Sequence, residues 1–176
     1  MVNGKILVLA GCLMLSGATV AEDMQDIHID IGQVESSDDL KPVDGLTSSG
    51  QPDADEFALF AEAGYVAVVD LRGETEDRGL DEEAVLAELD MDYVSLPLAS
   101  PDAINFENAA RLDEILSGFD GPVLVHCGSG NRVGALLALR ESQNGASAED
   151  ALQYGRDAGM TGAEPLVRSR LAAKDE

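Results

Sequence analysis

The chain has 176 residues, 45% of them hydrophobic, which suffices for one domain with a sizeable core but not for two. It carries 34 acidic residues against 11 basic ones, a formal net charge of -23 at pH 7. Because such a surface repels polyanions, we expect neither nucleic acid nor anionic membranes among its partners.

Residues 1–21 have the composition of a cleavable export signal. A short apolar stretch after Lys5 is followed by small residues, and acidic residues begin after Ala21. A lipoprotein signal ending at Cys12 is the alternative. We predict a periplasmic or secreted protein, with Cys127 as the only cysteine of the mature chain. No other stretch reaches the ~20 apolar residues of a membrane span, so we expect none.

An acidic segment, residues 22–44, separates this signal from a folded domain, residues 45–176. The segment is poor in large apolar side chains. Its brief apolar alternation over residues 27–31 predicts either an edge strand or an irregular segment.

Helix and strand patterns alternate through the folded domain. Residues 65–71 form an almost continuous apolar, β-branched run, typical of a strand covered on both faces of a sheet. The alternation predicts an α/β fold, a three-layer sandwich with a mainly parallel central sheet flanked by helices, whose functional loops collect at the carboxyl ends of the strands. The predicted strands are 65–71, 93–98 and 122–126, and the predicted helices are 53–63, 81–89, 106–116, 133–139, 151–158 and 164–172.

The strongest chemical signal is PVLVHCGSGNRVGALLALR, residues 122–140. Here an apolar strand delivers Cys127 into a Gly-rich loop, and Arg132 opens a helix. A thiol is a nucleophile as its thiolate, and the free N–H groups of a helix N-terminus together with a guanidinium stabilise that charge. The same groups bind oxyanions, so the loop predicts a nucleophile and an anion site together.

The loop resembles that of the cysteine-dependent phosphatases, which share a His-Cys signature, a Gly-rich loop and an Arg that opens a helix. The stretch SSGQPDADEFALFAEAGYVAVVDLRGETED, residues 48–77, is similar to the opening of the beta-lactamase hydrolase-like phosphatase family, a relative of tyrosine and dual-specificity phosphatases. The matching segments cover roughly residues 45–170. The resemblance implies that residues 45–176 are a phosphatase-like catalytic domain.

The resemblance also implies phosphoester hydrolysis in two steps. Cys127 would attack phosphorus, and Arg132 and the loop amides would bind the equatorial oxygens. Water would then hydrolyse the phosphocysteine intermediate. Asp102, after the second predicted strand, would protonate the leaving oxygen, with Asp70 and Glu74 as rival acids. The residues expected to bind substrate or orient the loop are His126, Gly128, Ser129, Gly130 and Asn131.

A phosphorylated protein or small molecule would be the substrate, and we expect neither a cofactor nor a metal. One His beside one Cys does not make a ligand set, and the acids are scattered.

Two departures from the phosphatase pattern keep other functions open. Four residues separate Cys127 from Arg132, where tyrosine phosphatases have five, and Val133 stands where many carry a hydroxyl that assists breakdown of the intermediate. The shorter spacing is also similar to rhodaneses, so a sulfurtransferase using a Cys127 persulfide is the alternative. A non-catalytic domain that binds oxyanions or phospho-ligands is the second alternative.

Overall fold

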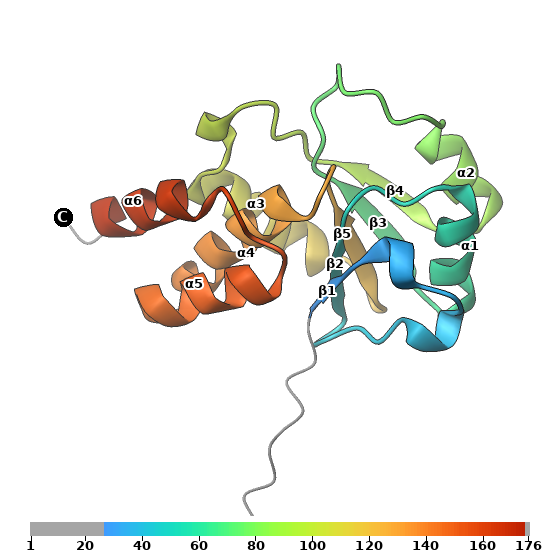
Figure 1. The fold of residues 1–176 in the computed structure, drawn as a ribbon, viewed down its shortest axis with the longest axis horizontal. Coiled ribbons are helices and arrows are strands. Elements are labelled where there is room, and N and C mark those ends of the chain that lie inside the picture. Colours follow the sequence, from blue (N-terminus) through green and yellow to red (C-terminus); the bar gives the residue numbers. More distant parts are fainter. Residues whose placement is uncertain (1–26, 175–176) are drawn as a thin grey trace, which may run out of the picture.

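The computed structural model describes residues 27–174, so the predicted signal and Cys12 lie outside the described residues. Its centre is a five-stranded sheet in the order β1-β2-β5-β3-β4, in which every neighbouring pair is parallel (Figure 1). The strands are β1 (His28–Ile29), β2 (Leu46–Ser49), β3 (Ala67–Asp70), β4 (Asp92–Ser95) and β5 (Val123–His126).

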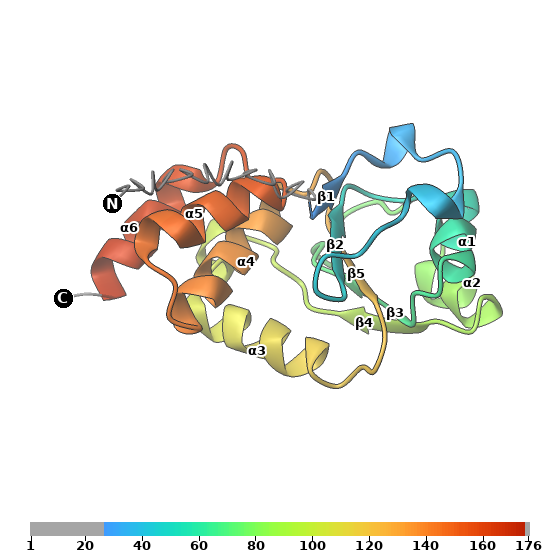
Figure 2. The same ribbon diagram turned by 90° about the horizontal axis from the view of Figure 1, so that it is seen from below.

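Helices cover both faces of this sheet, as Figures 1 and 2 show from two directions. One face carries α1 (Ala54–Glu62) and α2 (Glu82–Glu88). The other carries α3 (Phe106–Leu116), α4 (Asn131–Gln143), α5 (Ala148–Asp157) and α6 (Glu164–Lys174). Three short 3-10 helices span Ile31–Gln33, Ser37–Asp39 and Pro101–Ala103. The predicted three-layer α/β sandwich is confirmed.

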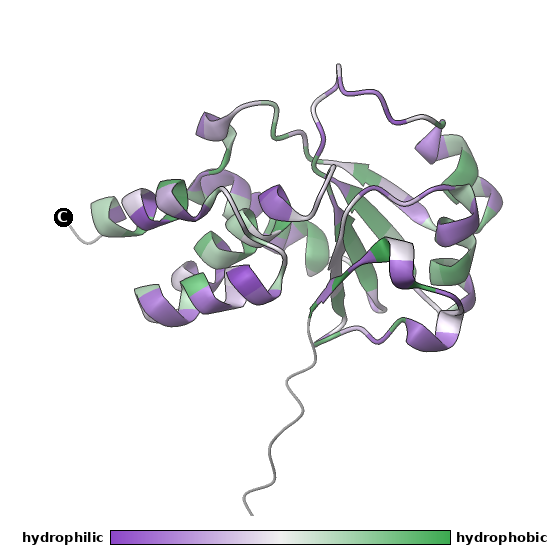
Figure 3. Ribbon diagram, viewed as in Figure 1, coloured by the Kyte–Doolittle hydropathy of each residue, from purple (hydrophilic) through white to green (hydrophobic). Residues whose placement is uncertain are grey.

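Local sequence explains where several elements begin. Asp53 caps α1 by accepting a hydrogen bond from the backbone N–H of Glu56, whose side chain bonds back to the Asp53 N–H. Ser147 caps α5 in the same position, which starts that helix at Ala148, three residues before the predicted start. Strands β3 and β5 are buried along their whole length, in keeping with their apolar runs (Figure 3).

Strand β2 is the element that the sequence pattern did not predict. Its residues LTSS are short and mostly polar, yet all four are buried between β1 and β5. Tertiary hydrogen bonds satisfy the hydroxyls: Thr47 pairs with the Tyr65 hydroxyl at 2.5 Å, and Ser48 donates to the Ala158 carbonyl at 2.8 Å. A pattern of apolar residues cannot reveal such a strand, because its burial depends on partners far along the chain.

The N-terminal part of the described chain packs on the sheet. Strand β1 is an edge strand, one of the two outcomes expected for residues 27–31, and Ile27 and Leu40 are buried. Within residues 27–174, no helix is long and apolar enough to cross a membrane.

Candidate active site

The Cys loop begins where β5 ends, at the centre of the sheet. The Cys127 side chain is buried, and its backbone N–H lies 3.4 Å from the Ser49 carbonyl at the end of β2. Gly130 then turns the chain into α4 with φ of 79°, a left-handed conformation that favours glycine. The nucleophile candidate therefore lies at the carboxyl edge of the sheet, immediately before a helix N-terminus.

A second reason for glycine at position 130 is the His28 ring of β1. A Cβ on Gly130 would overlap this ring, and so would a Cβ on Gly159. The His28 Nδ1 lies 3.3 Å from the Ser48 hydroxyl. The edge strand thus packs directly against the Cys loop, although sequence analysis gave His28 no role.

Arg132 is held by Glu76, which lies in the loop after β3. Its Nη1 donates to Glu76 Oε1 at 2.5 Å and to the Leu98 carbonyl at 3.3 Å, and its Nη2 donates to Glu76 Oε2 at 2.7 Å. A guanidinium has five N–H groups, and hydrogen bonds among the described residues use three. Two N–H groups therefore remain for an oxyanion or a thiolate.

The electrostatics of this pair follow from its geometry. The hydrogen bonds from Arg132 lower the pKa of Glu76 to about 2, so this carboxylate is ionised at neutral pH. The same pairing raises the pKa of Arg132, and Cys127 adds to the effect, because its thiol lies within interaction distance of the guanidinium. Cys127, Arg132 and Glu76 thus form one interacting group.

The other loop residues lie in different environments. Gly128 and Ser129 are exposed, and Ser129 forms an isolated bridge with Gly50. The side-chain oxygen Oδ1 of Asn131 accepts hydrogen bonds from the backbone N–H groups of Thr161 and Ala163 at 2.8 and 3.1 Å. Asn131 therefore ties the loop to the turn before α6, while its predicted contact with substrate stays a prediction.

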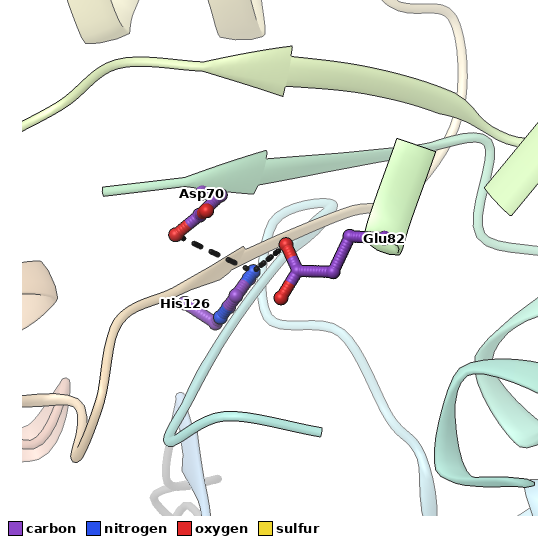
Figure 4. A group of neighbouring side chains, drawn as sticks. All are labelled: Asp70, Glu82 and His126. Atoms are coloured by element: carbon purple, nitrogen blue, oxygen red, sulfur yellow. Dashed lines mark ion pairs between the residues drawn. The ribbon is translucent and has the colours of Figure 1, made fainter. Parts of the chain in front are cut away.

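His126 points to the opposite face of the sheet from Cys127. Its ring is fully buried near the α1 residue Phe57, whereas Cys127 belongs to the core beneath α3 to α6. Its Nε2 lies 3.5 Å from Glu82 Oε2 and 3.8 Å from Asp70 Oδ1 (Figure 4). Any effect of His126 on substrate or thiolate would have to be indirect, through the backbone at the end of β5.

Two arginines complete the charge network around Asp70 and Glu82. Arg72 Nη2 donates to Glu82 Oε1 at 2.9 Å, and its Nε lies 3.4 Å from Asp70 Oδ1. Arg78 Nε donates to Asp70 Oδ2 at 2.8 Å. Burial by itself raises the pKa of Glu82, but His126 and Arg72 outweigh burial and lower it to about 2. The network pairs two carboxylates with two guanidinium groups.

Asp70, Glu82 and His126 are the described residues that could hold a metal ion, since one potential ligand atom from each lies within 4.8 Å of the others. Both Asp70 oxygens and Glu82 Oε1 already accept hydrogen bonds from arginine. Only Glu82 Oε2 and the His126 nitrogens have no hydrogen-bond partner within this set, and a cation there would lie beside two guanidinium groups. The donor set favours a buried ion-pair network over a metal site.

The three candidate acids are now distinguishable by position. Asp102 lies in the Pro101–Ala103 helix with its side chain 96% exposed, and its Oδ1 is 3.3 Å from Arg170 Nη2. Glu74 is exposed in the loop after β3, whereas Asp70 is completely buried in the ion network. Of the three, Asp102 lies nearest in sequence to the residues 98–101 that line a cavity with Arg132.

Sequence analysis missed Glu76 and the Asp70–Glu82 network. A charged residue closing the buried run 65–71, as Asp70 does, could have indicated a buried partner. Nothing in the local sequence distinguishes Glu76 from the other acids of its loop, because its partner Arg132 follows 56 positions later.

Comparisons with known proteins agree with this architecture. Residues 38–146 match the family described as "Beta-lactamase hydrolase-like protein, phosphatase-like domain". A beta-lactamase hydrolase-like protein of Xylella fastidiosa is 33% identical over 112 residues, which are 61% of this chain and 26% of the relative. One from Agrobacterium fabrum is 27% identical over 104 residues, 57% of this chain and 24% of the relative. The chain thus matches about a quarter of the length of these curated relatives.

Solved structures share the fold. A candidate phosphatase from Neisseria meningitidis superposes with a TM-score of 0.61 at 18% identity, over 72% of this chain and 90% of the other. A candidate phosphatase from Shewanella putrefaciens gives a TM-score of 0.57 at 22% identity, over 81% of this chain and 98% of the other.

Proposed function

Because this chain belongs to the family of phosphatase-like domains found in beta-lactamase hydrolase-like proteins, we propose that it hydrolyses phosphomonoesters with Cys127 as nucleophile. The observation that carries the proposal is the interacting group of Cys127, Arg132 and Glu76 at the N-terminus of α4. A helix N-terminus and a guanidinium with spare N–H groups together favour a tetrahedral oxyanion.

The proposed reaction has two steps, and both use the same loop. In the first, the Cys127 thiolate attacks phosphorus, the P–S bond forms, the P–O bond breaks and the leaving oxygen takes a proton from an acid. In the second, water attacks phosphorus, the P–S bond breaks, and phosphate and the thiolate are released. Arg132 and the loop amides stabilise the equatorial oxygens in both transition states.

Asp102 remains our candidate for the acid. It lies on the segment that also carries Ser100 and Pro101, which line a cavity together with Arg132. Its ion pair with Arg170 is exposed and therefore weak, so the carboxyl can leave Arg170 when a substrate binds.

A paired assay on the reduced, purified protein tests the proposal. One arm measures release of phosphate from p-nitrophenyl phosphate, the other measures transfer of sulfur from thiosulfate to cyanide, and Cys127→Ser is the control in both. We expect phosphate release that is lost in Cys127→Ser, and little thiocyanate.

The second arm is needed because the four-residue spacing between Cys127 and Arg132 is similar to that of rhodaneses. Cysteine-dependent thiocyanate without phosphate release would replace our proposal by a sulfurtransferase. If neither arm shows turnover, binding of a phosphonate is measured separately. A protein that binds the phosphonate but turns over neither substrate would be an oxyanion-binding domain.

A further inference from the structure

A cavity of about 470 Å³ opens beside Arg132. One side is formed by the segment from Leu98 to Ile104, and the other by Gly162, Ala163 and Leu166 at the start of α6. This volume lies within the range of about 300–1,000 Å³ typical of sites for small molecules. Asn131 and Arg132, the first two residues of α4, also line it, so the cavity borders the guanidinium of the proposed anion site.

The walls of the cavity are mainly apolar. Leu98 and Ile104 are buried with only their edges at the cavity, and Leu166 is partly buried and packs on the main core. Among the described lining residues, Arg132 is the only one with a charged side chain. Because Arg132 is proposed to bind the phosphoryl oxygens, a leaving group with its own charge would find no further charged partner among these lining residues and would lose hydration on entry.

The α6 side of the cavity lies outside residues 38–146, the part that matches the phosphatase-like family. It is nevertheless fixed to the Cys loop, because Asn131 accepts hydrogen bonds from the Thr161 and Ala163 N–H groups. These hydrogen bonds thus fix the position of the α6 wall relative to the Cys loop. Residues 162–166 are in a position to add specificity to a catalytic loop that the family shares.

We propose that this cavity receives the leaving group of the substrate, that this group is an apolar alcohol or phenol with no charge of its own, and that Leu166 determines this specificity. The inference rests on the proposed function of the Cys loop. The net charge of -23 also favours an uncharged leaving group. It repels substrates that carry negative charges in addition to those of one phosphoryl group.

Two non-hydrolysable probes test the cavity separately from catalysis. Methylphosphonate presents the anion alone, whereas phenylphosphonate adds an apolar group, and calorimetric titration gives a Kd for each. We expect the wild type to bind phenylphosphonate at least about tenfold more tightly. Leu166→Ala should reduce this preference several-fold and leave methylphosphonate binding unchanged. The matched control is Leu59→Ala, a partly buried leucine of α1 on the other face of the sheet.

A second variant narrows the cavity instead of widening it. A Cβ at Gly162, which lines the cavity, would meet no atom within 4 Å, and the backbone there is not left-handed, so the position accepts a Cβ without strain. Gly162→Leu should weaken phenylphosphonate binding about tenfold while sparing methylphosphonate.

The outcomes separate this inference from the proposed function. The expected probe preference without any phosphate release would support the cavity assignment and overturn the hydrolase. Phosphate release from a protein with no preference between the probes would overturn the cavity assignment alone. An equal loss of both probes in Leu166→Ala would also overturn it, because Leu166 would then act on the anion site.

Discussion

His126 and Cys127 are neighbours in the chain, but their side chains lie in two regions of opposite character. His126 faces α1 and α2 in a network whose two carboxylates are paired with Arg72 and Arg78. Cys127 faces the other layer, beside a guanidinium whose hydrogen bonds to oxygen atoms of the described residues use three of its five N–H groups. Because consecutive strand residues point to opposite faces, one strand end builds both a paired network and a reactive site.

The loop between β3 and α2 joins the two regions. Arg72 and Arg78 anchor it to the buried network, and Glu76 extends from it to Arg132. We infer that the network fixes the fold of the loop and that the loop positions the guanidinium. Substitutions in the network should therefore change stability first, and substitutions at the Cys loop should change activity first.

The largest expected effect is that of Arg72→Ala. Removing this buried guanidinium takes away the arginine partner of Glu82 and leaves Asp70 with Arg78 alone, which we expect to lower the free energy of unfolding by about 3–5 kcal/mol. Urea denaturation at pH 7 measures it. A change below about 1 kcal/mol would mean that the network contributes little to stability.

Replacing the arginine of the Cys loop by alanine should instead lower activity and leave stability almost unchanged. We expect Arg132→Ala to lower kcat/KM for p-nitrophenyl phosphate by about 10²–10³, comparable to the loss of an oxyanion donor, and to change stability by less than about 1 kcal/mol. Steady-state kinetics and the denaturation curve are measured on one preparation. If Arg132→Ala instead unfolds the protein and Arg72→Ala lowers only activity, the division between the two regions is wrong.

Acid should weaken the network through Glu82. Its pKa is about 2 in the folded protein against the usual 4.5, so its contribution is complete above pH 4.5 and is lost as the pH falls towards 2. The linked free energy is on the order of 3 kcal/mol. We expect the stability difference between wild type and Glu82→Gln to be largest near pH 7 and to shrink below pH 4.5. A difference that stays constant from pH 7 to pH 3 would contradict this assignment.

The smallest expected effect concerns the link between the regions. Glu76→Gln retains the size of the side chain but loses the ionic half of a bidentate contact, so the guanidinium should be held less well. We expect kcat to fall about tenfold with little change in the thermal midpoint. Glu83→Gln, at an exposed position of α2, is the matched control and should leave kcat unchanged. Equal kinetics in the two variants would show that Glu76 does not position Arg132.

Prediction from sequence succeeded where local signals are sufficient. The helix predicted over 106–116 has these same bounds in the structure, and the predicted strands 65–71 and 122–126 contain β3 and β5. The Cys loop could also be predicted, because strand, glycines and Arg132 are adjacent in the chain. In each case the determining interactions join residues only a few positions apart.

Other features required the whole fold. Strand β2 is polar, and its position depends on β1, β5 and hydrogen bonds to residues such as Ala158, 110 positions from Ser48. The order of the strands likewise brings β5 between β2 and β3.

The sequence by itself determined the fold class, the nucleophile candidate and its guanidinium, because hydrophobic period, capping and loop composition act over short distances. Only the tertiary structure decided that Glu76 holds Arg132, that His126 turns away from Cys127 into a buried ion network, and that Leu166 lines the cavity. These contacts join segments separated by tens of residues. Which acid pairs with which arginine depends on how the layers pack. The chain has 34 acidic residues, and their local sequences do not distinguish the few that pair with a particular arginine.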